Sequence, residues 1–472
     1  MIKYLIPLFL LLISCGRTKT ETVKKPNILY IYTDQQHANM MSTAGNPWLK
    51  TPAMDYIANN GIRFTHAYAT NPVCSPSRVS LMTGRFPGFF KDKNGKRVRE
   101  NFGSMSIPTV SEEVANTTLA SFLKQAGYDL FFGGKQHLPS SLTAEALGFE
   151  NISTDERFEL AKRASQEIKK SHDKPWCMVV SLVNPHDICY MAIREMATSE
   201  FDAKILKQGT HEVSVLDEAM KIPEGVSEEE FFKSYCPDLP ENYEPQFEEP
   251  KAVTNLINKR PMRKNARENF TDEQWKHHRY AYCRLTERVD SQIQLILDAL
   301  KESGEEENTL VLFSSDHGDM DGAHRMEHKS TLYEESVNIP FLAMWKGQIP
   351  AGQVNATHLI SNGLDLLPTL CDYAGVKGVS DPRGRSMRPL FEGKNVSWRA
   401  SLGVESEIGN MVVHEDGLKY IRYDAVGIEE QLLDLSKDPK ETIHFTKQAE
   451  YEKRLRLLRD DFDTYWFPAM HN

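Results

Sequence analysis

Short apolar runs alternate with amphipathic segments of helical length through most of the chain. The run at 27–34, NILYIYTD, is aliphatic and aromatic and ends in a carboxylate, which is typical of a buried strand with Asp34 at its end. Similar runs predict further strands at 62–69, 128–134, 176–186, 308–317 and 340–345.

Segments with a helical period separate these runs. They predict helices at 51–61, from Ser77 onward with Ser75 as the N-cap, and at 118–127, 272–304 and 364–376. This alternation indicates an α/β fold in which helices flank an open, mostly parallel sheet. In such folds the ligand site lies at the C-terminal ends of the strands.

The pattern changes near residue 400. Two hairpin-like stretches, 411–424 and 429–442, precede a last helix at 451–466, which predicts a smaller C-terminal α+β domain with a short antiparallel sheet plus a helix. We therefore assign 26–382 to the main domain and 383–472 to a C-terminal subdomain. The stretch 190–272 is polar, rich in Pro and Glu and poorly periodic, so we expect a long loop insertion that sets specificity.

The first residues have the pattern of a signal peptide. Lys3 precedes an apolar stretch at 5–13 that is too short to span a bilayer. The sequence LISC resembles a bacterial lipobox, which predicts a signal at 1–15, a lipidated Cys15 and a polar tether at 16–25. We expect an exported protein, in the periplasm or anchored to the outer membrane only through lipid.

The composition limits the classes of partner and of metal or disulfide site that we expect. The 472 residues carry a net charge of −10 and contain no basic block, which argues against nucleic acid but permits an anionic substrate in a local cationic pocket. Of the seven cysteines, five remain beside Cys15 and Cys74, without a repeating interval. This spacing argues against a disulfide framework and against a zinc pattern, and it leaves open whether Cys189 and Cys236 pair.

Reactive groups gather just after the predicted strands. They are Asp34, Gln35, Cys74, Arg78, Lys135, His137, His186, Asp316, His317 and Lys329. Two carboxylates, an amide and an imidazole can hold a divalent cation, and the remaining cations can hold an anion. Histidine adds acid–base capacity near neutral pH. This set of groups suits the hydrolysis of an anionic ester.

Cys74 lies between Pro72 and Pro76, in neither an apolar run nor a cysteine pair. CSPSR, continued by SLMTGRFP, resembles the Cys-x-Pro-x-Arg signature of the type I, formylglycine-dependent sulfatases, which have the alkaline-phosphatase-like fold. Eight more segments follow the family order: PNILYIYTDQ, GNPWLKTPAMD, GGKQHL, SSDHGDMDGAH, KSTLYEES, LDLLPTLCDYAGV, GRSMRPLFEG and LLDLSKDPKET. The chain thus resembles a bacterial carbohydrate sulfatase, with 26–382 as its catalytic domain.

The resemblance implies a modified nucleophile and a metal. A formylglycine-generating or anaerobic maturation enzyme would oxidise Cys74 to Cα-formylglycine (3-oxoalanine), whose hydrate attacks sulfur. Asp34, Gln35, Asp316 and His317 match the metal ligands, with residue 74 beside the ion. Ca²⁺ is the usual ion of the family. Family members often have Asp-Asp and Asp-Asn at the two ligand pairs, so this less anionic site leaves Mg²⁺ or Mn²⁺ open.

The resemblance also implies roles for the remaining groups. Arg78 would hold the aldehyde hydrate, and Lys135 and Lys329 would bind sulfate. His137 would take a proton as sulfate leaves, and His186 would protonate the leaving alcohol. The loop before Lys329 is interpreted as substrate-binding through His324, Arg325 and His328.

We therefore expect a sulfatase that cleaves the S–O bond of sulfate monoesters on a sulfated oligo- or polysaccharide, in glycan degradation. Three alternatives remain. One is a phosphonate monoester or phosphodiester hydrolase on the same scaffold, another is an arylsulfatase of small molecules, and the third is an inactive glycan-binding protein. The intact signature around Cys74 argues against the last, because a binder needs no maturation signal.

Overall fold

The computed structural model describes residues 25–92, 94–95, 97–99, 110–378, 381–424 and 429–468. The predicted signal at 1–15 with its Cys15, and all of the tether except residue 25, lie outside the described residues. Within the described part, no helix combines the length and the apolar character needed to cross a membrane.

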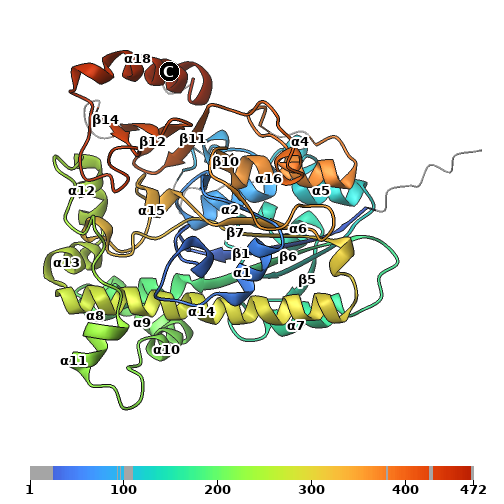
Figure 1. The fold of residues 1–472 in the computed structure, drawn as a ribbon, viewed down its shortest axis with the longest axis horizontal. Coiled ribbons are helices and arrows are strands. Elements are labelled where there is room, and N and C mark those ends of the chain that lie inside the picture. Colours follow the sequence, from blue (N-terminus) through green and yellow to red (C-terminus); the bar gives the residue numbers. More distant parts are fainter. Residues whose placement is uncertain are drawn as a thin grey trace, which may run out of the picture.

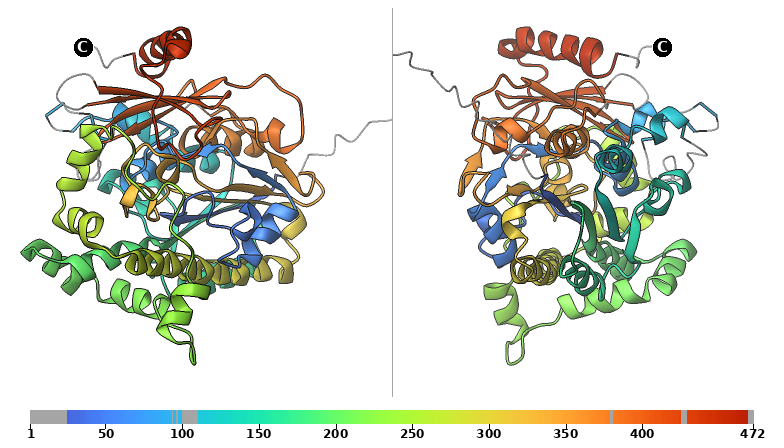
Figure 2. Two further views of the ribbon diagram at one scale, coloured as in Figure 1. Left: turned by 60° about the vertical axis from the view of Figure 1, so that its left-hand side comes forward. Right: turned by 90° about the vertical axis from the view of Figure 1, so that its right-hand side faces the viewer.

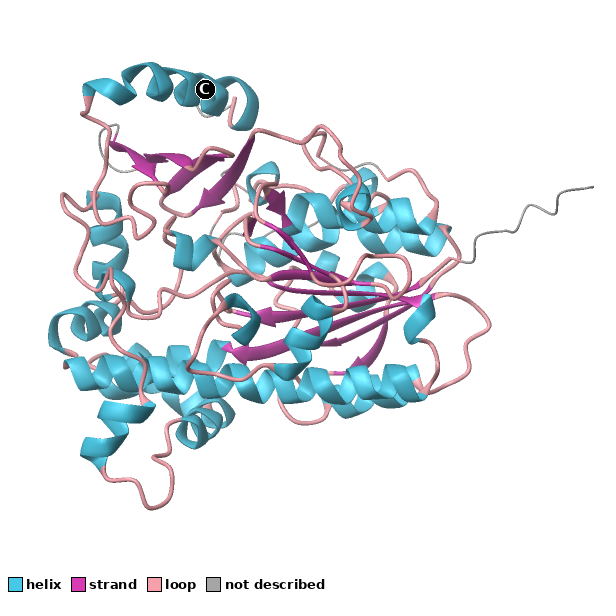
Figure 3. Ribbon diagram, in the orientation of Figure 1, coloured by secondary structure: helices cyan, strands magenta, loops and turns pink. Residues whose placement is uncertain are grey.

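A mixed sheet of eight strands forms the centre of the described structure (Figures 1 and 3). Its order is β5-β4-β6-β1-β7-β8-β2-β9, and only β8 runs antiparallel to its neighbours. The bounds are β1 (Asn27–Asp34), β2 (Ile62–Phe64), β4 (Asp129–Gly134), β5 (Glu150–Ser153), β6 (Trp176–Pro185), β7 (Thr309–Ser315), β8 (Phe341–Met344) and β9 (Gln353–Asn355). The predicted α/β fold with a mostly parallel sheet is confirmed.

Strand β1 shows why these runs are apolar throughout. Ile28 and Tyr30 belong to the core on one face of the sheet, whereas Leu29 and Ile31 belong to the core on the other. Successive side chains of a strand point to opposite faces, and here helices cover both faces (Figure 2). One layer contains α2 (Cys74–Thr83), α5 (Leu119–Gln125) and α16 (Asn362–Ala374), and the other α1 (Pro52–Asn59), α7 (Leu160–Ile168) and α14 (Asp272–Glu302).

The C-terminal part forms a second, antiparallel sheet. It runs in the order β11 (Ser401–Ser406), β12 (Gly409–His414), β13 (Leu418–Tyr423) and β14 (Glu429–Asp434). Helix α18 (Glu452–Asp461) and the π-helix η9 (Phe462–Trp466) pack on this sheet, seen in red in Figure 1. The predicted small α+β unit is confirmed, while its boundary at residue 383 stays a prediction.

The expectation of a long loop at 190–272 is wrong. The segment is mainly helical, and its helices are α8 (Cys189–Met196), α9 (Glu200–Gln208), α10 (Thr210–Ala219), α11 (Glu228–Glu230), η5 (Phe231–Tyr235), α12 (Lys251–Asn258) and α13 (Pro261–Asn269). Helices this short depend on tertiary packing rather than on propensity. Val215 and Leu216 of α10, for example, pack with Tyr282 and Leu285 of α14. Because each of these helices has so few apolar positions, the sequence shows no helical period in this segment.

Three local predictions also need correction. The single strand expected at 62–69 is two short strands, β2 and β3 (Ala67–Tyr68), and β3 pairs with β10 (Ile360–Ser361). Ser75 is not the N-cap, because α2 already begins at Cys74 after an extended Val73. The six described cysteines are all free and buried, so Cys189 and Cys236 form no disulfide.

Short helical turns follow several strands and helices. They are η1 (Ser42–Ala44), η2 (Pro87–Phe89), α4 (Glu112–Ala115), η3 (Ser140–Leu142), α6 (Ala144–Leu147), η4 (His186–Ile188), η6 (Glu306–Asn308), η7 (Ala323–Arg325), α15 (Glu334–Val337), α17 (Arg388–Phe391) and η8 (Ala449–Tyr451). Turn η4 matters most for function, because it places His186 directly after β6.

A buried ion pair links α16 to the segment that precedes β11. Arg399 donates through both Nη atoms to the Asp365 carboxylate, at 2.6 Å each, and neither side chain is appreciably exposed. We predict that Arg399→Ala lowers the free energy of unfolding by about 3–5 kcal/mol, because it leaves a buried carboxylate without its cation. Denaturant unfolding followed by fluorescence measures the change.

Arg456→Ala is the matched control. Arg456 pairs with Glu452 on the exposed face of α18, where both side chains are about two-thirds exposed. Its removal should change the free energy of unfolding by less than about 1 kcal/mol. Equal effects of the two substitutions would contradict the role given to Asp365.

Candidate active site

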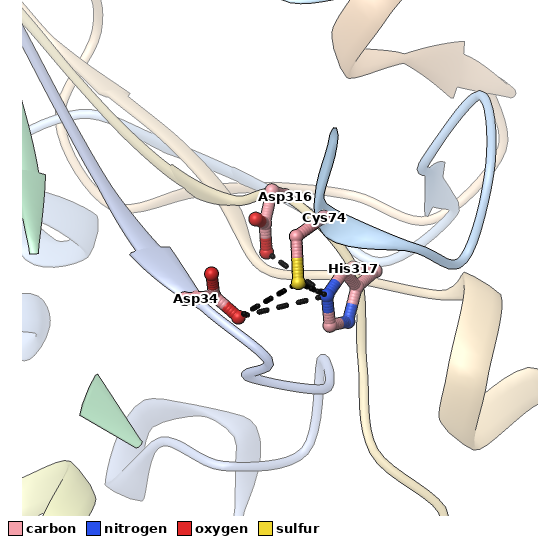
Figure 4. Close-up of side chains that lie close together, drawn as sticks. All are labelled: Asp34, Cys74, Asp316 and His317. Carbon is pink, nitrogen blue, oxygen red and sulfur yellow. Dashed lines mark hydrogen bonds and ion pairs between the residues drawn. The ribbon is translucent and has the colours of Figure 1, made fainter. Parts of the chain in front are cut away.

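The site lies at the C-terminal edge of the central sheet. Parallel strands β1 and β7 are neighbours, with Thr33 opposite Ser315, so Asp34 and Asp316 emerge side by side. Helix α2 begins at Cys74 against the same edge. Figure 4 shows the side chains of Asp34, Cys74, Asp316 and His317 pointing toward one another.

These four side chains form a tight buried cluster. Each offers one ligand atom, and the four atoms lie within 4.8 Å of one another. The Sγ atom of Cys74 lies 3.1 Å from His317 Nε2 and 3.5 Å from Asp34 Oδ1. His317 Nε2 is 3.6 Å from an Oδ1 atom of each aspartate.

Arg78 orients both carboxylates. It lies one helical turn after Cys74 and is fully buried, where it donates to Asp34 Oδ2 and Asp316 Oδ2 at 2.8 Å each. Its Nη1 also donates to the backbone oxygen of Lys135 and to Ser181 Oγ. Because Arg78 uses the Oδ2 atoms, the Oδ1 atoms remain directed toward Cys74.

The donor set fits a divalent cation. Two adjacent buried carboxylates repel each other unless a cation lies between them, and oxygen with imidazole nitrogen is a common ligand combination. The Nδ1–H of His317 donates to the backbone oxygen of Gly318 at 2.8 Å. In the neutral ring this leaves the Nε2 lone pair facing the cluster, which is the tautomer that a metal ligand requires.

Gln35 lies against the cluster in a constrained conformation. Its φ of 72° is left-handed, and its Oε1 accepts hydrogen bonds from Lys329 Nζ at 2.7 Å and Cys189 Sγ at 3.1 Å. Its Nε2 donates to Asp319 Oδ2. The amide oxygen therefore faces the side of Lys329 and Cys74, and a ligand role for Gln35 stays a prediction.

Two lysines complete the cationic side of the site. Lys135 Nζ lies 2.8 Å from Asp34 Oδ2, and Lys329 Nζ lies 2.9 Å from Cys74 Sγ. Burial and Asp34 raise the pKa of the Cys74 thiol, but Lys329, His317 and Lys135 outweigh them and hold it well below its usual value. Negative charge is therefore stabilised at the position of this sulfur.

The two carboxylates differ in their electrostatics. Burial would raise the pKa of Asp34, but Lys135, His186 and Lys329 hold it well below the ordinary value. Burial, reinforced by the charge of Asp34, instead raises the pKa of Asp316. The pair thus carries more negative charge at Asp34, next to both lysines.

His186 acts electrostatically on Asp34 without joining the cluster, and His137 follows Lys135 by two residues. Nδ1 of each ring is buried and has no hydrogen-bond partner in the described structure, although His186 Nδ1 lies 3.9 Å from Asp187 Oδ1. Burial lowers the pKa of His186, with Lys135 adding to the effect. His137 follows β4 in a left-handed conformation with φ of 47°. A role for either ring in proton transfer stays a prediction.

The predicted substrate residues separate into two places. His324 packs on Tyr333 and contacts the backbone of Glu244, and Arg325 pairs with the Glu244 carboxylate and covers the Tyr243 ring. None of these contacts involves a residue of the cluster. His328, in contrast, is buried and immediately precedes Lys329. A substrate role for each stays a prediction.

Sequence reasoning missed three residues beside the site. Asp319 holds the Gln35 amide, Cys189 contacts Gln35 Oε1, and Arg263 lies on α13 within electrostatic range of both. The sequence could have indicated Asp319, because this residue follows His317 by two positions in SSDHGD. Nothing in the sequence distinguishes Cys189 from the other buried thiols or Arg263 from its neighbours.

Comparison with known proteins agrees with this geometry. A family model described as Sulfatase matches residues 26–376, and one described as N-sulphoglucosamine sulphohydrolase, C-terminal, matches residues 322–465. Two Bacteroides thetaiotaomicron proteins are similar over most of their length. The Delta 4,5-hexuronate-2-O-sulfatase is 27% identical, covering 95% of this chain and 91% of that protein. The N-acetylglucosamine-6-O-sulfatase is 26% identical, covering 96% and 88%.

A solved structure supports the same assignment. The structure described as a 2-O GAG sulfatase has a TM-score of 0.76 and 26% identity, and the match covers 93% of this chain and 92% of that one. The Sulfatase model spans most of the chain, including every residue of the cluster. The chain therefore belongs to the sulfatase family of sulfate ester hydrolases.

Proposed function

We propose that the protein hydrolyses a sulfate monoester of a sulfated carbohydrate through a formylglycine hydrate made from Cys74. The position of Cys74 carries this proposal. Its Sγ is buried, 2.9 Å from Lys329 Nζ and 3.1 Å from His317 Nε2, and it faces the carboxylate pair. A hydroxyl in this place would meet cations that hold a sulfate and ligands that hold a metal.

Oxidation of the cysteine matters because of how the covalent intermediate breaks down. One hydroxyl of the hydrate attacks sulfur, and the S–O bond to the sugar breaks as the alcohol leaves with a proton. The second hydroxyl then loses its proton, the carbon–oxygen bond to sulfate breaks, and the aldehyde and sulfate are released. Water restores the hydrate. A thiolate would instead form a thiosulfate-type adduct, which has no second hydroxyl and cannot release sulfate in this way.

The cations divide the remaining work. Lys135 and Lys329 would bind the sulfate oxygens, and Arg78 holds Asp34 and Asp316 in place. A divalent cation held by Asp34, Asp316, His317 and Gln35 would favour deprotonation of the attacking hydroxyl and draw charge from the sulfate. Ca²⁺ is the proposed ion, and Mg²⁺ and Mn²⁺ are tested beside it below.

The two histidines suit the proton transfers. We assign to His186 the protonation of the leaving alcohol and to His137 the proton of the second hydroxyl. A donor must be protonated, whereas burial and Lys135 lower the pKa of His186 in the free protein. A bound sulfate adds negative charge next to Lys135, which shifts His186 back toward its protonated form.

A carbohydrate substrate is supported by the relatives. Two of the similar proteins act, by their names, on a sulfated hexuronate and on a sulfated N-acetylglucosamine. The helices α8 to α13 lie beside the C-terminal edge of the sheet and add protein surface there. This additional surface suits a substrate larger than a simple aryl sulfate. With the lipobox, this supports a lipid-anchored exported enzyme of glycan degradation, matured by a formylglycine-generating or anaerobic maturation enzyme.

We predict that Cys74→Ala lowers sulfate release from a sulfated sugar by at least about 10³-fold, because no other group can form the self-releasing intermediate. Ion chromatography of sulfate measures turnover. Mass spectrometry of a peptide covering residues 71–78 should show that the active protein has lost sulfur and two hydrogens and gained one oxygen.

Cys371→Ala is the matched control, since this buried thiol belongs to the core around α16 and should leave turnover unchanged. Surviving activity in Cys74→Ala would disprove the formylglycine mechanism. A phosphate diester is assayed alongside the sulfate ester, and a higher kcat/KM on the diester would favour the phosphonate and phosphodiester hydrolase alternative.

Removal of the metal gives a second prediction. Treatment with a chelator should abolish sulfate release and lower the melting temperature, because the Asp34 and Asp316 carboxylates would then repel each other. Added Ca²⁺ should restore both properties, and restoration by Mg²⁺ or Mn²⁺ is compared at equal concentration. Full activity after exhaustive chelation would rule out a metal at this cluster.

The role of His186 predicts a dependence on the leaving group. His186→Ala should reduce kcat/KM on sugar sulfates by about 10²–10³-fold but much less on nitrophenyl sulfate, whose phenolate leaves without a proton. His172→Ala, at the opposite edge of the sheet near Trp176, should affect neither substrate. An equal loss on both substrates in His186→Ala would show that the residue does not act as the general acid.

A further inference from the structure

Arg263 is a cation without a partner in a largely buried position. It lies in the first turn of α13, and its Nε is buried with no hydrogen-bond partner. Its guanidinium makes no hydrogen bond or ion pair with any residue in the described ranges. Charged side chains that leave solvent are normally paired, so an unpaired guanidinium indicates a place where an anion comes from outside the chain.

The fold places Arg263 next to the catalytic edge. Helix α13 packs against α8, whose first residue Cys189 has its Sγ 3.1 Å from Gln35 Oε1. That same oxygen accepts a hydrogen bond from Lys329, whose Nζ lies 2.9 Å from Cys74 Sγ. Arg263 therefore stands on the side of the cluster that the inserted helices form.

The charge of Arg263 affects the pKa of a neighbouring residue. The pKa of His328 is held well below its usual value, first by burial and then by Arg263, with smaller contributions from Lys329 and His186. Burial lowers the pKa of Arg263 itself, and Glu407, Cys189 and Asp319 oppose this only in part. The charge of Arg263 therefore acts on His328, the residue next to Lys329.

Two of the nearby carboxylates have partners of their own. Glu407 forms an ion pair with Lys259 at 3.0 Å, and Asp319 accepts hydrogen bonds from Gln35 and the backbone of Asp321. Glu327 lies against His328, and its carboxylate oxygens have no hydrogen-bond partner in the described structure. A purely structural role for Arg263 as the partner of one of these groups has no contact to support it in the described structure.

We propose that Arg263 binds a second anionic group of the substrate, a carboxylate or another sulfate, on the sugar whose sulfate ester is cleaved at Cys74. This proposal rests on the proposed sulfatase function and names its substrate class as a sulfated sugar with at least two negative groups. The planar guanidinium suits this task, because its paired N–H donors match the two oxygens of such a group.

The test uses matched pairs of sugars. A hexuronate 2-O-sulfate is compared with the hexose 2-O-sulfate, in which a CH₂OH group replaces the carboxylate. Glucosamine-2-N,6-O-disulfate is compared with N-acetylglucosamine 6-O-sulfate, in which a neutral acetamide replaces the N-sulfate. Arg263→Ala should raise KM for one dianionic sugar by about 10- to 100-fold and leave its kcat and the monoanionic counterpart nearly unchanged. The pair that responds identifies the second group as carboxylate or sulfate.

Lys264→Ala is the matched control, because it removes an exposed cation from the same helix, where Lys264 faces Glu268. It should change no KM, and melting temperatures check that both variants fold. Arg263→Lys keeps the charge and loses the paired donors, so its KM should fall between those of Arg263→Ala and the unchanged protein.

A binding experiment tests the role of Arg263 independently of the proposed sulfatase function. Calorimetry with the Cys74→Ala protein, alone and combined with Arg263→Ala, measures affinity for the same sugars without turnover. A selective loss of affinity for a dianionic sugar supports the role of Arg263 even if no sulfate is released. An unchanged or equal effect of Arg263→Ala within both pairs overturns it, whether or not the enzyme is a sulfatase.

Discussion

The site depends on one buried guanidinium. Arg78 is fully buried and has its charge matched by Asp34 and Asp316, which lie at the ends of adjacent parallel strands. A buried cation is tolerated only when its donors are used, and these carboxylates use two of them. The same helix begins at Cys74, so a single element positions the proposed nucleophile and fixes the carboxylates against it.

The local charge of the site opposes that of the whole protein. The chain carries a net charge of −10, yet Arg78, Lys135 and Lys329 outnumber Asp34 and Asp316 around the cluster. An excess of buried cations favours an anionic ester over a neutral one, and a divalent ion would increase that preference. The net negative charge bears on solubility, whereas substrate choice depends on the charges close to the cluster, because solvent and salt screen distant surface charges.

Much of the site could be predicted because it follows strand ends. The run 27–34 ends in Asp34, and the run 308–317 ends in Asp316 and His317, so parallel pairing brings the two aspartates together. The helices of 190–272 could not be predicted, because their few apolar residues are buried only by packing against distant parts of the chain, such as α14 and the C-terminal sheet. The position of Arg263 could not be predicted for the same reason. The segment PMRKNAREN is typical of a surface helix, and only the packing of α13 against α8 shows that Arg263 lies near the site.

Chemistry and substrate choice therefore lie in parts of the fold with different cores. The residues proposed to bind sulfate come from the edge of the central sheet, whereas Arg263 belongs to helices whose small core contains Ala192, Ala266 and Trp275. Substitutions in that core can move Arg263 without disturbing the Arg78 network. The two parts meet where Cys189 contacts Gln35. Because Gln35 also binds Lys329, a substitution at Cys189 would act on both substrate choice and catalysis.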